Sequence, residues 1–153
     1  MKKLLLLSLL GAIGTSVSAA SNCSISYSAD NKLTEIIRKN NFEFDNYNEV
    51  CERLKSANAK VDLRYSSAIS NQQATAVVIA TVEDINFPIF SNNYKRSIWS
   101  SPERTTAMEI ELLMDAVNDA LNVIDQSDIK GLNENRKKLS FKTYPASSGI
   151  NIK

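Results

Sequence analysis

The amino-acid sequence predicts an α+β fold: a small antiparallel sheet of about four strands, covered by two short N-terminal helices and one long helix, with one disulfide. Three observations predict this class. Apolar residues alternate with polar ones in several short segments, they recur at helical spacing in three others, and two cysteines follow an export signal. The expected order is strand, two helices, two strands, long helix and strand, which favours helices packed on an antiparallel sheet.

The first twenty residues have the pattern of a secretory signal peptide. A basic start precedes an apolar run over 4–13, and small residues at 17–20 supply a cleavage site. The apolar run is too short for a membrane span. We therefore expect a bacterial Sec-type signal peptide, 1–20, and a single mature domain, 21–153, with a flexible C-terminal end. The expected location is the periplasm or the medium outside the cell.

The mature chain opens with apolar side chains at every second position of residues 23–28, which predicts a half-buried strand. Two short amphipathic helices are expected next. Asp30 or Asn31 caps the first helix, and the asparagines at 40–41 end it. Asp45 caps the second helix.

The rest of the chain predicts two strands, a long helix and a last strand. Residues 61–65 alternate as a one-face strand, and 75–82 are apolar on both faces, as in a central strand antiparallel to the first. A capping serine, a proline and an acid predict a long helix over 101–124. A loop over 126–135 and a final strand over 138–143 complete the domain.

The long helix has an apolar arc wider than one sheet face requires, once Leu112, Ala116 and Val123 are included. Two interpretations follow. Either the helix is wedged between the sheet and other elements, or a strip of it is covered by a second chain. A homodimer is left open for this reason.

Cys23 and Cys51 are the only cysteines, and export would place them in an oxidising compartment. We expect a disulfide that joins the first strand to the second helix. Closing this loop should stabilise the fold by about 3–4 kcal/mol in the chain-entropy model. Two buried free thiols are the alternative.

The residue inventory excludes several classes of chemistry. The chain has no histidine, and residues 21–153 have only two glycines, so histidine-based catalysis and glycine-rich phosphate loops are ruled out. Without Lys2 and Lys3 the mature net charge is about −1, which gives no strong overall attraction to nucleic acid or to an anionic bilayer. No apolar run of 21–153 is long enough to span a membrane. We expect no cofactor, no metal and no nucleic-acid partner.

Carboxylates remain for an enzyme. Glu83 and Asp84, which follow the central strand, are the least arbitrary pair for hydrolysis of a glycosidic bond, although the polar end of a strand is the better explanation of them. A carboxylate-dependent hydrolase of cell-wall glycans is therefore kept as an alternative.

Two surfaces are expected to recognise a partner. The first is an irregular, aromatic-rich loop over 84–101, because aromatic and arginine side chains anchor interfaces. Its partner-binding residues would be Phe87, Phe90, Tyr94, Arg96 and Trp99. In the other interpretation of this segment, the rings pack beneath the long helix and 94–99 form another strand.

The second surface is the polar arc of the long helix, which carries acids and amides without a base. Its acids are Glu111, Asp115, Asp119 and Asp125. Like charges stacked on a helix repel, so this arc is suited to a basic partner; a solvated face explains it as well.

These observations predict an exported, non-catalytic binding protein: an inhibitor, an immunity-type protein or an envelope interaction module. Its partner would be another protein in the envelope or outside the cell. The alternatives are the hydrolase and a structural subunit of an envelope assembly.

Overall fold

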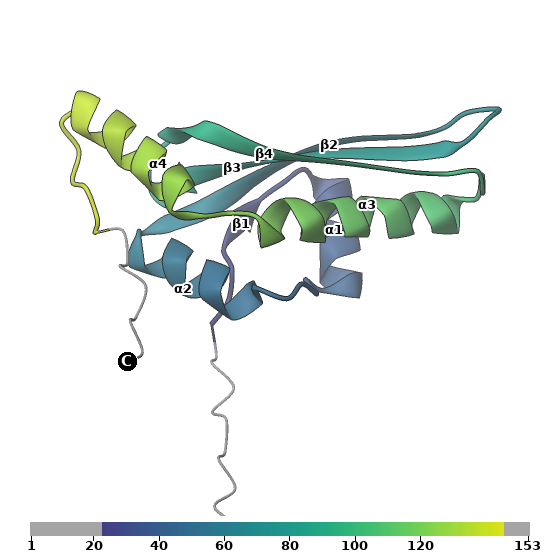
Figure 1. The fold of residues 1–153 in the computed structure, drawn as a ribbon, viewed down its shortest axis with the longest axis horizontal. Helices are drawn as coiled ribbons and strands as arrows, with labels where there is room; N and C mark the ends of the chain where they lie inside the picture. The colour runs from purple at the N-terminus through teal and green to yellow at the C-terminus, as the bar shows by residue number, and fades with distance from the viewer. Residues whose placement is uncertain (1–22, 146–153) are drawn as a thin grey trace, which may run out of the picture.

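The computed structural model describes residues 23–145, shown in Figure 1. The expected signal peptide, 1–20, and the last part of the expected C-terminal end, 146–153, lie outside the described residues. The elements follow the order β1 (Tyr27–Ser28), α1 (Asn31–Asn40), α2 (Tyr47–Ser56), β2 (Ala59–Ile69), β3 (Ala74–Asp84), β4 (Phe90–Ser101), α3 (Thr106–Asn122) and α4 (Gln126–Lys138).

The four strands form one sheet in the order β1-β2-β3-β4. The pairs β2–β3 and β3–β4 are antiparallel, whereas β1 runs parallel to β2. The α+β class is therefore confirmed, and the sheet is mixed rather than purely antiparallel. The parallel pair arises because the chain between β1 and β2 forms α1 and α2 before it returns to the sheet.

The sheet has one covered and one open face. Alternate residues of β3, from Ala74 to Val82, are fully buried on the face toward the helices. The residues between them are only half-buried and point to the opposite face. In Figure 1, α1, α2 and α3 lie on one side of the sheet, and α4 packs near one end of β4.

α3 is wedged between the sheet and the two N-terminal helices (Figure 1). This position accounts for its wide apolar arc, because Leu112 and Ala116 are both buried within the chain. Val123, just after α3, stays half exposed. The burial of Leu112 and Ala116 fits the wedge interpretation.

The long helix starts later than expected. Ser101 pairs with Ala74 at the end of β4, and its Oγ accepts a bond from Glu103 N at 3.2 Å. The cap is Thr105, whose hydroxyl accepts from Met108 N at 3.1 Å. Strand pairing thus overrides a local serine–proline helix signal.

The second helix also differs at its start. Asp30 caps α1 as expected, through a 2.8 Å bond from Leu33 N. The cap position of α2 is Asn46 rather than Asp45, and the side chain of Asn46 forms no capping bond. It donates instead to the carbonyl of Asn122 at 3.4 Å.

The expected loop over 126–135 and strand over 138–143 are wrong. Residues 126–138 form α4, which begins with a reciprocal capping box between Asp125 and Asp128. After α4, no strand forms within 139–145. Gly131 suggested a loop, yet it lies inside α4, where a Cβ would stand 2.6 Å from Ser91 Oγ. The glycine therefore permits a close helix–strand approach. The fourth strand is β4.

The disulfide between Cys23 and Cys51 is present, with the two Cα atoms 6.0 Å apart. It joins the segment that precedes β1 to the buried face of α2. The expected strand over 23–28 is shorter than predicted, since only Tyr27 and Ser28 pair with β2.

Among the helices of residues 23–145, none has the length and apolar character needed to cross a bilayer.

Candidate functional site

The open face of the sheet is the most distinctive surface of the molecule. The residues of β4 that project from it include Tyr94, Arg96 and Ile98, of which Tyr94 is 64% and Ile98 52% exposed. Their cross-strand neighbours in β3 are the half-buried Thr81, Ile79 and Val77. Apolar, aromatic and basic groups therefore share one solvent-facing surface, which we call the open sheet face.

Two arginines flank an isoleucine across this face. Arg64 of β2 and Arg96 of β4 both pair with Ile79 of β3, from opposite sides. Because neighbouring strands lie about 4.8 Å apart, the two arginine backbones are roughly 10 Å apart. Arg64 Nε donates to Asp62 Oδ2 at 2.9 Å. Within residues 23–145, the Arg96 guanidinium forms no hydrogen bond or ion pair.

A shallow hollow of about 460 Å³ lies on the open sheet face. Charged, hydroxyl, aromatic and aliphatic side chains share its lining. The lining residues are Asp62, Arg64, Ile79, Thr81, Phe90, Ser91, Tyr94 and Arg96.

The segment 84–101 is not the irregular loop that we expected. Asp84 Oδ1 accepts bonds from Asn86 N at 2.8 Å and from Phe87 N at 3.1 Å, which closes a tight turn. Strand pairing resumes at once, with Phe90 opposite Glu83. The alternative expectation of a strand over 94–99 is confirmed, but its rings are not packed in the core.

The structure brings together three of the five expected binding residues. Phe90, Tyr94 and Arg96 share the open sheet face. Trp99 pairs with Ala76 and therefore lies on the helix side of the sheet, partly exposed. Phe87 lies in the turn, with its ring centroid 4.6 Å from that of Phe141.

The expected acidic face of the long helix is divided among different contacts. Asp119 Oδ2 accepts a bond from Ser97 Oγ of β4 at 2.6 Å. Asp125 lies beyond α3 and caps α4. Glu111 and Asp115 line a hollow of about 310 Å³ between α1 and α3, together with Glu43.

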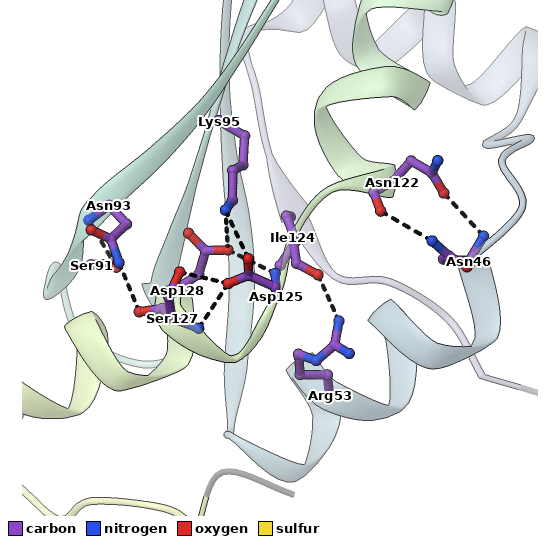
Figure 2. A network of polar contacts seen from close by, with 10 residues as sticks. All are labelled: Asn46, Arg53, Ser91, Asn93, Lys95, Asn122, Ile124, Asp125, Ser127 and Asp128. Atoms are coloured by element: carbon purple, nitrogen blue, oxygen red, sulfur yellow. Dashed lines mark hydrogen bonds and ion pairs between the residues drawn. The ribbon is translucent and has the colours of Figure 1, made fainter. Parts of the chain in front are cut away.

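The amides of the same arc hold the chain that precedes α2. Asn118 Oδ1 accepts from Glu43 N, and Asn122 Oδ1 accepts from Asn46 N, each at 3.1 Å. Figure 2 shows the second contact beside Arg53, whose Nη1 donates to the carbonyl of Ile124 at 2.6 Å. These polar groups therefore fasten the helices to one another.

Asp125 belongs to a charged cluster at the junction of α3, α4 and β4 (Figure 2). Lys95 Nζ lies 3.4 Å from Asp125 Oδ2 and 3.2 Å from Asp128 Oδ2. Burial raises the pKa of Asp128, whereas hydrogen bonds from Ser127 lower the pKa of Asp125. Asp125 is thus occupied in fastening α4.

The expected carboxylate pair is separated by the strand itself. Glu83 and Asp84 project from opposite faces of β3. Glu83 lies 3.3 Å from Lys60 Nζ, and Asp84 forms an ion pair with Arg136. In the part of the chain from 23 to 145, no cluster of three metal-ligating side chains occurs.

Sequence reasoning missed Arg64, Ile79 and Ile98 as members of the site. The alternation of 61–65 places Arg64 on a polar strand face. Its neighbours depend on the pairing register, which links it to Ile79 and, through Ile79, to Arg96.

Comparison with known proteins adds no family, because the chain matches no protein-family model, no curated protein and no solved structure.

Proposed function

We propose that this chain is an exported binding protein that recognises another protein through the open sheet face. The observation that carries the proposal is the row of Arg64, Ile79 and Arg96 across three strands, in which both arginines are exposed and Ile79 is half-buried, with the exposed Tyr94 and Ile98 beside it. The disulfide between Cys23 and Cys51 supports export, since such bonds persist in oxidising compartments.

The composition of this face is unusual for a sheet surface that meets water. An antiparallel sheet with one solvated face normally presents polar residues there. Here Val77, Ile79 and Ile98 form an apolar strip instead, bordered by Tyr94 and Arg96. Exposed apolar surface with a polar rim marks interaction sites, and arginine and tyrosine are enriched among residues that dominate binding energy.

The charge of the face indicates an acidic partner. The Arg96 guanidinium has no carboxylate within residues 23–145, so its five donors are available to a ligand. A carboxylate can accept two parallel bonds from such a group. We therefore propose a partner that presents Asp or Glu beside an apolar patch.

Catalysis would require a different site. The hollow between α1 and α3 contains Glu43, Glu111 and Asp115, which is the arrangement closest to a carboxylate hydrolase. Glu43 and Glu111 are solvent-exposed and Asp115 is half-buried. The two glutamates therefore lie in contact with solvent rather than in an enclosed pocket. Binding is therefore the proposal.

The test is capture from the cell envelope with the purified, oxidised protein as bait, followed by direct titration of the captured partner. We expect Arg96→Glu and Tyr94→Ala each to weaken binding at least about tenfold, the scale of an interface anchor. Arg38→Glu is the matched control, because Arg38 is an exposed arginine on α1.

The proposal fails if the combined Arg64→Glu, Tyr94→Ala, Arg96→Glu variant unfolds like the wild type and still binds every captured protein with unchanged affinity. Hydrolysis of cell-wall glycan by the wild type, lost in Glu111→Gln, would support the hydrolase instead.

A further inference from the structure

A second exposed apolar patch lies where α4 ends beside the turn between β3 and β4. Phe87, Leu139 and Phe141 are 46%, 57% and 39% exposed. The rings of Phe87 and Phe141 are in contact, with centroids 4.6 Å apart. Leu139 and Pro88 line one shallow hollow of about 400 Å³. We call Phe87, Leu139 and Phe141 the end patch.

Hydrogen bonds of the fold hold the end patch at the surface. Asp84 Oδ1 closes the turn that carries Phe87, while Asp84 Oδ2 accepts from the buried Arg136 of α4. Phe141 N donates to the carbonyl of Arg136 at 2.8 Å. The Tyr144 ring covers the same guanidinium at 4.8 Å. Two distant chain segments are thus held together with their apolar side chains facing outward.

Lysines lie along the same stretch of chain as this patch: Lys138 lines the hollow with Leu139, and Lys142 follows Phe141. α4 and the residues after it carry the exposed side chains of Lys130, Lys137, Lys138 and Lys142. None of these four forms an ion pair with any residue of the 23–145 range. From Lys130 to Tyr144, Glu134 is the only acid. The chain is nearly neutral overall, yet this end has a local excess of positive charge.

We propose that the end patch and its lysines dock the protein on an anionic phospholipid surface. Aromatic and leucine side chains enter the boundary between headgroups and acyl chains, and flexible lysines reach the headgroup charges. The patch is small and its apolar groups come from a turn and a post-helical segment with a hollow beside them. A fluid lipid surface adapts to this uneven shape, whereas a protein partner would need a surface of complementary shape.

The three apolar residues of the end patch do not line the hollow on the open sheet face, although Phe90 and Ser91 line both hollows. α4 lies at one end of the long axis of the molecule (Figure 1). A failure of lipid binding would therefore leave the proposal of a protein partner unaffected.

The experiment is co-sedimentation of the purified, oxidised protein with two kinds of vesicle. One is equimolar phosphatidylglycerol and phosphatidylcholine, and the other is phosphatidylcholine alone. We expect binding to the anionic vesicles that weakens as salt is raised, and little binding to the neutral ones. The Lys137→Gln, Lys138→Gln variant should lose about fivefold in partition coefficient per lysine removed.

Leu139→Ser should lose about tenfold in partition coefficient. The largely exposed leucine moves from water into the membrane when the protein binds, and serine gains nothing from this transfer. Val123→Ser is its matched control, because Val123 is 50% exposed just after α3 and belongs to neither proposed surface; it should bind vesicles like the wild type. Lys32→Gln with Lys55→Gln is the control for charge, since both lysines are exposed on α1 and α2.

Three results would overturn the proposal. The first is absence of binding to anionic vesicles at low salt. The second is an equal loss of binding in Leu139→Ser and Val123→Ser. The third is a concentration-dependent dimer in light scattering that Leu139→Ser abolishes without any effect on vesicle binding, which would assign the patch to a second copy of the chain.

Discussion

Arg136 of α4 and Asp84 at the end of β3 form a buried ion pair, with 0% and 4% of their surfaces exposed. Arg136 Nε and Nη2 donate to the same carboxylate oxygen, Oδ2, at 2.8 and 2.5 Å. Of the three remaining guanidinium hydrogens, two donate to the carbonyls of Ala57 and Asn58 at 2.9 Å and one donates to Asn133 Oδ1 at 3.1 Å. One side chain therefore joins α4, β3 and the turn between α2 and β2.

Arg136→Met should destabilise the protein by about 3–5 kcal/mol, because it leaves the Asp84 carboxylate buried without its cation. Urea unfolding measures this loss. Adding Asp84→Asn should recover part of it, since the amide is neutral and its oxygen can still accept from Asn86 N and Phe87 N. A loss of less than about 1 kcal/mol in the single variant would contradict this account of the pair.

Gly131→Ala should destabilise the protein although alanine is the better helix former. In an open helix this change gains about 1 kcal/mol. Here the new Cβ would stand 2.6 Å from Ser91 Oγ and 3.2 Å from Asn92 N, so the expected net effect is a loss of about 1–3 kcal/mol. Thermal and urea unfolding measure it. In a double-mutant cycle, Ser91→Ala should reduce the loss of stability that Gly131→Ala causes. If Gly131→Ala instead stabilises the protein, the helix and the strand approach each other less closely than described.

Reduction of the Cys23–Cys51 bond should lower the free energy of unfolding by about 3–4 kcal/mol, because the unfolded chain regains the freedom of the closed loop. Unfolding curves with and without reductant test this, and the Cys23→Ala, Cys51→Ala variant should match the reduced protein. Equal curves in both conditions would mean that the bond contributes nothing to stability.

The pH dependence of stability should contain a contribution from Asp128. Burial raises the pKa of Asp128 above its ordinary value of 3.8, so the native state binds this proton more tightly than the unfolded chain. Its contribution to the unfolding free energy therefore becomes more favourable as pH falls from the native pKa toward 3.8. The lowered pKa of Asp125 has the opposite effect on the pH dependence of stability. Asp125 is present in both the wild type and the variant that are compared below.

Asp128→Asn isolates this contribution, because the amide oxygen can still accept from Asp125 N. The difference in unfolding free energy, wild type minus variant, should rise as pH is lowered from about 7 to about 4. Urea unfolding at a series of pH values measures it. A difference that is flat or falls over this range would contradict the assignment.

The parts of the fold that the sequence predicted well depend on near neighbours. The apolar spacing of 31–40 and the cap at Asp30 belong to one helix, which the structure confirms. The strands predicted over 61–65 and 75–82 lie within β2 and β3. The two cysteines left one intramolecular pairing. Each of these signals is contained in a few adjacent residues or in a simple count.

The wrong predictions depend on distant partners. Ser101 has the local pattern of a helix cap, but it pairs with Ala74 in the sheet. Gly131 has the local pattern of a loop, but it allows α4 to approach Ser91 closely. In both cases a contact between separate segments outweighed a preference worth about 1 kcal/mol.

The open sheet face, which we propose as the binding surface, shows the same division. If 94–99 are taken as a strand, period-two alternation separates Tyr94, Arg96 and Ile98 from Trp99. The aromatic and arginine side chains of this stretch led us to expect binding. Local pattern thus supplied the chemical character of the site.

Packing supplied its location. Which of the two strand faces meets water depends on where α1, α2 and α3 settle, and the alignment of Arg64 with Arg96 depends on the register of three strands. The nearness of Phe87 to Phe141 depends on the buried pair of Arg136 and Asp84. These relations arise from burial and hydrogen bonding between remote segments, which no local pattern in the chain encodes.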